Sequence, residues 1–268
     1  WEIDSNEICK LTNLNSFELI NDFSVLIYGL KYFQETQYIS IQGKNNINSS
    51  LEDKFVSIVG AGTGLGIASG LITPNKIQVL PSEGGHSEFS PRTTEEWELA
   101  NWLKEDLNLA RLSIERVVSG TGLGHIARWM LMRSSAKLHP LRPLAEDFHS
   151  QNSNKFDMPA IVSAAAKKGD NLMLDAMNLW LSAYGSLAGD IALQNLCYTG
   201  LWIGGGSSQK NIEGIKSVTF LDSFKKKGRF TNFLESLPVM ALIDPEAGLF
   251  SAACRAHLLS IEMGDLSE

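Results

Sequence analysis

The chain has 268 residues, of which 44% are apolar and 20% are charged, so it can bury a sizeable core as one large domain or two lobes. Its formal net charge of −7, without a long basic run, argues against non-specific binding to nucleic acid or to an anionic membrane surface. No apolar stretch reaches the roughly 20 residues that a membrane-spanning helix needs. The three cysteines lie far apart and predict neither a disulfide framework nor a zinc cluster, so a cytoplasmic location is the simplest expectation.

Strands and turns dominate the first third of the chain. Alternating apolar residues predict strands, and clusters of polar residues, glycine and proline predict the turns between them. In chain order we expect a helix at 4–14, a strand at 17–23, a helix through 27–30, a polar loop at 41–54 and strands at 55–59, 67–72 and 77–80. The strand at 17–23 would carry a carboxylate, Asp22, at its C-terminal end.

Helical patterns dominate the rest of the chain. Thr93 and Glu96 have the spacing of a capping box and open a predicted helix. Further on we expect a strand or a helix end at 114–118, a helix from about 124, a polar connection at 137–158, a helical region at 160–196 interrupted at 168–170, strands at 200–206 and 238–244, and a helix at 248–263. Strands and helices interleave while some strands form hairpins, which predicts the α/β class with a mixed sheet.

A glycine-rich bend separates two of the predicted strands. The string GAGTGLG at 60–66 has neither the dinucleotide-binding spacing nor the P-loop spacing. Its backbone amides and the Thr63 hydroxyl can still hold a phosphate, and a plain turn is the alternative interpretation. Part of the string, GTGLG at 62–66, recurs at 120–124, so two tight bends at strand ends could face one cleft.

A second glycine-containing string, EGGHSE at 83–88, has the donors and acceptors of a polyol site. Glu83 can accept hydrogen bonds and His86 can donate them. A metal site with Glu88 as a third ligand is disfavoured, because no second histidine or cysteine lies nearby. A solvated turn is the remaining alternative.

Three more positions are candidates. Asn21 and Asp22 follow a predicted strand, where α/β proteins place catalytic groups, although a cap or turn is the more common role of such a pair. Glu115 precedes Arg116, and a surface ion pair is the simple interpretation of the two. The glycines at 204–206 fit either the start of a helix or a surface on which a flat ligand lies against bare backbone.

Taken together, these strings resemble the bacterial ATP-dependent glucokinase family of the hexokinase–actin superfamily. Five strings occur in the order of that family, over essentially the whole chain: LINDF at 19–23, GAGTGLG at 60–66, LPSEGGH at 80–86, ERVVSG at 115–120 and WIGGG at 202–206. The related ROK sugar kinases share an ExGH string but usually carry a cysteine-rich zinc motif. The three scattered cysteines of this chain argue against that branch. The resemblance implies a two-lobed hexokinase/actin-like (ribonuclease H-like) fold with mixed sheets.

The resemblance also implies a role for each matching residue. Asp22 would be the base that takes the proton from the sugar 6-hydroxyl. The other glucose hydroxyls would be held by Asn21, Glu83, His86 and Glu115. Contacts to ATP would come from the second phosphate loop, at Gly62, Thr63 and Gly64, and from Gly204 and Gly205 beneath the adenosine.

One family motif has no counterpart in these residues. The family opens with an Asp-x-Gly-Gly-Thr motif that contributes to binding the MgATP phosphates, and the 268 residues do not contain it. We therefore expect an incomplete small lobe, with residues 1–32 as its remnant, 33–248 as the large lobe and 249–268 as a helix that packs back on the small lobe. We also expect the chain alone to phosphorylate glucose weakly or not at all.

The expected activity is transfer of the γ-phosphoryl group of ATP, with Mg²⁺, to the 6-hydroxyl of D-glucose. The family resemblance also suggests a homodimer, and neither nucleic acid nor a membrane is expected as a partner. Two alternatives stay open: a sugar-binding protein that does not transfer phosphate, and a related kinase for mannose or an N-acetylated hexosamine.

Overall fold

A six-stranded mixed sheet forms the centre of the computed structural model, which describes residues 3–12, 14–45, 54–74, 76–149 and 156–264. Its strands are β1 (Tyr38–Gln42), β2 (Lys54–Ala61), β3 (Leu65–Ile72), β4 (Ile77–Leu80), β5 (Leu201–Gly204) and β6 (Val239–Leu242). They lie in the order β1-β6-β5-β2-β3-β4. β2 pairs antiparallel with β3 and parallel with β5, so the β2–β3 hairpin lies beside the end of β5. The mixed α/β class is confirmed.

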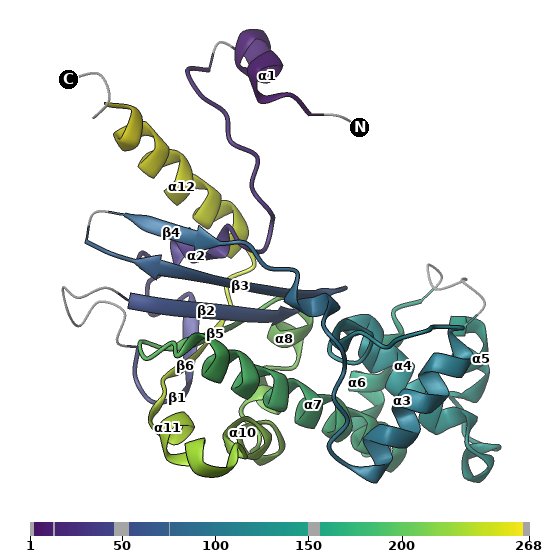
Figure 1. Cartoon of the computed structure of the whole chain (residues 1–268). Helices are drawn as coiled ribbons and strands as arrows, with labels where there is room; N and C mark the ends of the chain where they lie inside the picture. The colour runs from purple at the N-terminus through teal and green to yellow at the C-terminus, as the bar shows by residue number, and fades with distance from the viewer. Residues whose placement is uncertain (1–2, 13, 46–53, 75, 150–155, 265–268) are drawn as a thin grey trace.

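Helices cover the two faces of this sheet, as Figure 1 shows. On one face α2 (Leu26–Gly29), through Ile27, and α12 (Ala247–Gly264) pack over Trp202 and Met240 of the sheet. On the other face α7 (Asn171–Asn195) and α10 (Val218–Lys225) bury Trp180, Tyr184 and Phe220. β2 is buried along almost its whole length because apolar layers cover it on both sides.

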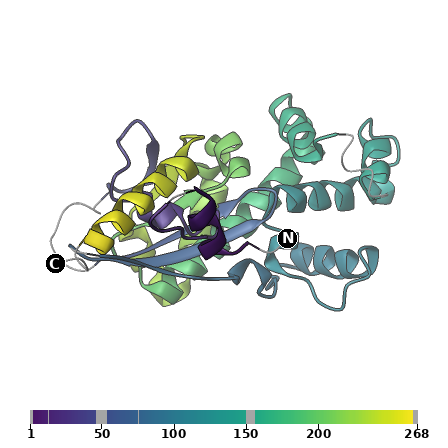
Figure 2. The ribbon, with the colours of Figure 1, turned by 90° about the horizontal axis from the view of Figure 1, so that it is seen from above.

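A group of four helices lies beyond the hairpin end of β2 and β3, and Figures 1 and 2 agree on this placement. The group contains α3 (Thr94–Asp106), α4 (Gly120–Met132), α5 (Arg142–His149) and α6 (Met158–Lys167). The shorter elements are α1 (Ser5–Thr12), α8 (Gly206–Lys210), α9 (Ile212–Ile215), α11 (Thr231–Ser236) and 3₁₀ turns at Gly84–His86, Ile114–Arg116, Ser134–Ala136 and Gly228–Phe230. Among the described residues, no helix is long and apolar enough to cross a membrane.

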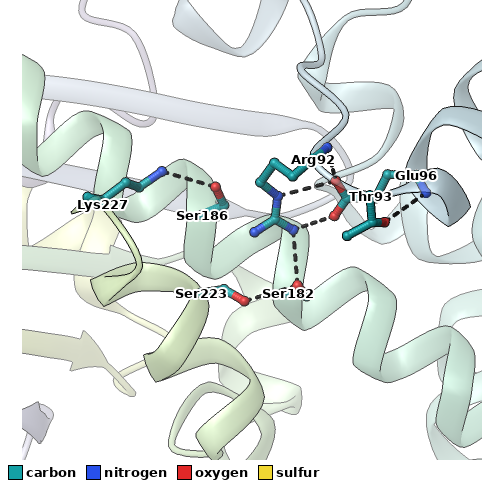
Figure 3. Close-up of polar contacts among 7 residues, drawn as sticks. All are labelled: Arg92, Thr93, Glu96, Ser182, Ser186, Ser223 and Lys227. Carbon is teal, nitrogen blue, oxygen red and sulfur yellow. Dashed lines mark hydrogen bonds and ion pairs between the residues drawn. The ribbon is translucent and has the colours of Figure 1, made fainter. Parts of the chain in front are cut away.

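A polar network fixes the loop that runs from β4 to α3 (Figure 3). The guanidinium of Arg92 donates to the buried carboxylate of Glu96 and, over 3.0 Å, to Ser182 on α7. Thr93 caps α3 by accepting a hydrogen bond from the amide of Glu96 at 3.2 Å, which confirms the predicted start of this helix. On α7, Ser182 also contacts Ser223 of α10 at 3.0 Å. The loop that carries residues 83–92 is thereby tied to the long central helix.

Four element predictions are wrong in detail. Residues 17–23 form no strand, because no described strand lies beside them to accept their backbone hydrogen bonds. The predicted connection at 137–158 contains α5, and the predicted loop at 41–54 begins inside β1. The helix expected from about residue 124 begins at Gly120, because Ser119 caps it there through the amide of Gly122 at 2.9 Å.

Candidate active site

A tight turn holds Asn21 and Asp22 beside the β2–β3 hairpin. Asn21 Oδ1 accepts hydrogen bonds from the backbone amides of Phe23, at 3.0 Å, and Ser24, at 2.9 Å. These bonds close the turn that leads into α2, so Asn21 has the capping role considered above. They occupy the amide oxygen, which leaves the Nδ2 group as the part of the side chain that can donate to a ligand. Asp22 follows at the exposed corner of the turn.

A row of three glycines seats this turn on the sheet. Gly66, Gly60 and Gly204 are register partners across β3, β2 and β5. The Phe23 ring lies over the row: a Cβ at Gly66 would stand 2.2 Å from it, and one at Gly60 would stand 2.5 Å from it. Any side chain at these two positions would push the ring away, so the glycines set the distance between Asp22 and the hairpin.

A cavity of about 460 Å³ lies between the turn and the hairpin. Its volume falls within the roughly 300–1,000 Å³ of small-molecule sites. The predicted site residues that line it are Asn21, Asp22, Gly62, Thr63, Gly64, Glu83 and Gly205. The structure thus brings together, around one space, residues that are up to 184 positions apart in the sequence, from 21 to 205.

The other two predicted sugar ligands, His86 and Glu115, do not line this cavity, but each lies within 4 Å of a residue that does. Glu83 comes directly before the 3₁₀ turn Gly84–His86, and His86 is the last residue of that turn. Both side chains are exposed, and 3.7 Å separate His86 Nε2 from Glu83 Oε2. A Cβ at Gly85 would stand 2.4 Å from the Leu65 carbonyl oxygen, so glycine lets this turn pack against the start of β3. Glu115 Oε2 accepts a hydrogen bond from the Leu65 amide at 3.1 Å.

Backbone pairing holds these two ligand-bearing segments side by side. The amide of Phe89 donates to the Leu112 carbonyl at 2.9 Å, and the amide of Ile114 donates to the Ser87 carbonyl at 2.8 Å. Arg111 adds a side-chain bond to the His86 carbonyl at 2.7 Å. Glu83, His86 and Glu115 therefore belong to one supported unit rather than to independent loops.

The repeated GTGLG strings meet in space. The Gly62 carbonyl accepts hydrogen bonds from the Gly120 amide at 2.8 Å and from Ser207 Oγ at 3.1 Å. Thr121 Oγ1 donates to the Thr63 carbonyl at 3.0 Å. The first copy bends between two strands, whereas the second begins helix α4 instead of ending a strand. The strings therefore form one junction with the start of α8, and sequence reasoning named Gly62 and Thr63 there but missed Thr121 and Ser207.

A second, larger cavity of about 1,070 Å³ borders the same junction, and Gly62 and Thr63 line both cavities. Gly206 lines it as well, and a Cβ at Gly206 would meet no protein atom within 4 Å. Gly205 has φ +84°, where a side chain is strained, and a Cβ there would stand 2.5 Å from the Ala61 carbonyl oxygen. Gly204 differs from the prediction in its surroundings, because it is buried and its nearest neighbours are Ile58 and Phe23.

A buried tyrosine, Tyr184, hydrogen-bonds to the strand and the helix on either side of the junction. The hydroxyl of Tyr184 donates to the Val59 carbonyl at 3.2 Å, accepts from the Ala61 amide at 3.2 Å and contacts Ser208 Oγ at 3.0 Å. Complete burial raises the pKa of Tyr184 to about 12, so the phenol stays protonated. This residue connects α7 to β2 and α8. Among the described residues, no group of three or more His, Cys, Asp or Glu is placed to hold a metal ion.

The class of protein is that of hexokinase–actin-like sugar kinases: the α/β fold carries a glycine-rich junction beside a cavity lined by the carboxylates of Asp22 and Glu83, and the structural neighbours belong to that class. The glucokinase family model matches residues 1–259. The chain belongs to the glucokinase family.

Individual relatives agree with this assignment. The chain is 34% identical over 264 residues to a glucokinase of Nostoc punctiforme, covering 96% of this chain and 76% of the relative. The crystal structure of a glucokinase from an Antarctic psychrotroph superposes with a TM-score of 0.76 at 25% identity, covering 94% of this chain and 72% of that one. A ROK family glucokinase from Streptomyces griseus, in complex with glucose and AMPPNP, shares the fold with a TM-score of 0.56 at 21% identity, covering 93% and 70%.

Proposed function

We propose that this protein is an ATP-dependent glucokinase, which transfers the γ-phosphoryl group of ATP to the 6-hydroxyl of D-glucose. The observation that carries the proposal is the smaller cavity, where the Asp22 carboxylate and the Gly62–Gly64 backbone line one space. Family membership supports a hexose kinase that uses ATP. The solved relative that holds glucose together with AMPPNP supports this pair of substrates.

In the proposed mechanism the protein positions groups and moves one proton. Glucose would lie in the smaller cavity, with its hydroxyls on Asn21, Glu83, His86 and Glu115, and Asp22 would accept the proton of the 6-hydroxyl as that oxygen attacks phosphorus. The backbone at Gly62, Thr63 and Gly64 would hold the transferred phosphate. Phosphoryl transfer depends mainly on such positioning and on charge stabilisation.

The larger cavity is our candidate for the nucleotide. Its wall at Gly206 has no side chain and leaves space for a flat or bulky group. Gly205 lines the smaller cavity and holds the start of α8 against β2, and Gly204 is buried, so the place of these two glycines beneath the adenosine stays a prediction. Mg²⁺ would arrive on the phosphates of ATP and neutralise part of their charge. We assign no residue of this chain to the metal.

One assay separates this proposal from its alternatives. ADP release should be measured with glucose, mannose and N-acetylglucosamine, beside calorimetric binding of each sugar, both for the 268-residue chain and for a form that also carries the family's Asp-x-Gly-Gly-Thr motif. ADP release that is fastest with glucose supports the proposal. Faster release with another hexose identifies a related kinase, and glucose binding without ADP release by the form that carries the motif identifies a sugar-binding protein. A homodimer, a cytoplasmic location and lobes bounded near residues 32 and 248 stay predictions.

The sugar ligands give a first prediction. Glu83→Gln, His86→Ala and Glu115→Gln should each weaken glucose binding by roughly 1–3 kcal/mol, because a hydroxyl loses a charge-assisted partner. The effects should be non-additive, since all three residues would contact one ligand. Calorimetry measures them, and Glu98→Gln on the exposed side of α3 is the matched control. Unchanged glucose affinity in all three variants would remove these residues from the site.

The bare wall of the larger cavity gives a second prediction. Gly206→Ala should weaken AMPPNP binding by about tenfold, because the new methyl group enters ligand space. The free energy of unfolding should not fall, since the methyl group meets no protein atom. Gly248→Ala, another position with open space around it, is the control. Equal AMPPNP affinity in Gly206→Ala and wild type would place the nucleotide elsewhere.

A further inference from the structure

The larger cavity continues past the glycine junction along one face of α4. Thr121, His125 and Arg128 are spaced by four and three residues, so they share this face. The cavity volume of about 1,070 Å³ slightly exceeds the usual upper limit of about 1,000 Å³ for one small-molecule site. We call the part of the wall away from α8 the α4 side, which is formed by Asp106, Arg116, His125, Arg128 and Phe148.

His125 lines this space, and one of its two ring nitrogens has no hydrogen-bond partner among the described residues. Its side chain is 6% exposed, and Nδ1 lies 3.1 Å from the Arg116 carbonyl oxygen. A carbonyl oxygen can only accept, so Nδ1 carries the hydrogen. Burial lowers the pKa of His125, the charges of Arg116 and Arg128 lower it further, and Asp106 and the bond to Arg116 oppose them in part. The neutral ring therefore has an Nε2 without a hydrogen; no described residue bonds to it, and His125 lines the cavity.

The two arginines of the α4 side differ in how many hydrogen-bond and ion-pair partners they already have. Arg128 is buried; it donates to the Ala145 carbonyl at 3.0 Å and to Asp106, and it lies over the Trp102 ring at 5.0 Å. Arg116 is exposed, and the described residues give its guanidinium no hydrogen bond or ion pair. The α4 side thus combines one cation, Arg116, and one acceptor, His125 Nε2, to which no described residue bonds.

We propose that the α4 side is a binding site for a sugar phosphate, separate from the glucose and nucleotide positions. A phosphate group matches the guanidinium of Arg116. An ionised phosphate has only acceptors, so it cannot satisfy His125 Nε2, which needs a hydroxyl donor from the same ligand. A phosphorylated polyol supplies both groups. The choice of glucose 6-phosphate as representative rests on the proposed function, whereas the site itself does not.

The placement of this site has a consequence for the proposed reaction. Glu115 and Arg116 are neighbours in one 3₁₀ turn, and their side chains serve different spaces: Glu115 contacts the hairpin, while Arg116 lines the larger cavity. A sugar phosphate bound at Arg116 therefore leaves the glucose cavity open. Binding of this ligand should not compete with binding of glucose.

Calorimetric titration of the 268-residue chain with glucose 6-phosphate tests the proposal. We expect binding that persists with saturating glucose and with saturating AMPPNP. Arg116→Gln and His125→Asn should each weaken it by about tenfold or more, while the affinities for glucose and AMPPNP stay within about twofold. Asparagine can still donate to the Arg116 carbonyl and has no group in place of Nε2, so His125→Asn isolates the acceptor. Arg133→Gln, a change in an arginine that stacks on Trp129 just past the other end of α4, is the matched control.

Four outcomes would overturn the proposal. Loss of binding when glucose is added would place the sugar phosphate in the smaller cavity. Equal losses of AMPPNP affinity in the two variants would assign the α4 side to the nucleotide. Equal binding of inorganic phosphate, unaffected by His125→Asn, would leave a simple anion site. No binding of glucose 6-phosphate to a folded wild-type chain would remove the site altogether. Absence of turnover by a form that also carries the Asp-x-Gly-Gly-Thr motif, by contrast, would contradict the proposed function and leave this site untouched.

Discussion

Replacing Asp22 by asparagine is expected to lower the turnover of glucose phosphorylation by about 10²–10⁴-fold, the usual contribution of a positioned general base. The amide keeps the size of the carboxylate but cannot take the proton of the 6-hydroxyl. Glucose affinity should stay within a few fold, because Asn21, Glu83, His86 and Glu115 would still hold the sugar. A coupled ADP-release assay, on a form of the protein that turns glucose over, measures the first quantity, and calorimetry measures the second.

The control for Asp22→Asn is Asp175→Asn, which removes an exposed carboxylate from α7. It should leave turnover and glucose affinity unchanged. Near-normal turnover of Asp22→Asn would show that another group accepts the proton, and the assignment of Asp22 would then be wrong.

The sequence predicted most accurately those elements whose signals are local. Thr93 lies three residues before Glu96, and the structure has the expected cap on α3, although the Glu96 carboxylate bonds to Arg92 instead of closing the capping box. The glycine-rich bend at 60–66 is a hairpin turn between two apolar strands. The break at 168–170 separates α6 from α7, where Asp170 caps the second helix. Each of these features depends on residues a few positions apart.

Elements that depend on distant partners were predicted less well. The alternation at 17–23 favours a strand, but a strand forms only when another strand pairs with it. Helix α5 was missed because its proline was taken as a sign of a loop, although Pro143 lies in the first turn, where a helix tolerates proline. Strand β1 was missed because its pairing with β6 brings together segments about 200 residues apart, such as Tyr38 and Leu242.

The candidate site, too, was predicted where its signals are local and missed where they depend on residues far apart in the sequence. Nearly all the predicted residues came from family strings, and the structure gathers most of them around one cavity. The repeated GTGLG string hinted that residues 62–66 and 120–124 meet, and they do. The contact between Phe23 and the glycine row had no sequence signal, because it depends on the register of three strands. The Nε2 atom of His125, to which no described residue bonds, was equally hidden from the sequence.

We expect the second large effect, a loss of both stability and turnover, from Gly66→Ala in the row of Gly66, Gly60 and Gly204. The new methyl group would stand 2.2 Å from the root of the Phe23 ring, so the ring and the turn behind it must shift. Overpacking of this kind typically costs 1–3 kcal/mol of stability, to be read from urea unfolding. A displacement of about 1 Å at Asp22 would lower turnover by about 10²-fold. Gly248→Ala, a helix position with open space around it, should lower neither quantity.

Removing the ring from the same variant tests the cause of these effects. If the clash with Phe23 carries the cost, Phe23→Ala combined with Gly66→Ala should lose less stability than the sum of the two single losses, because the ring can be displaced only once. Hydrogen exchange at the Ser24 amide, which donates to Asn21 Oδ1 at 2.9 Å, should speed up in each single variant as the turn opens. Strictly additive losses, with unchanged exchange at Ser24, would mean that the glycine row does not position Asp22.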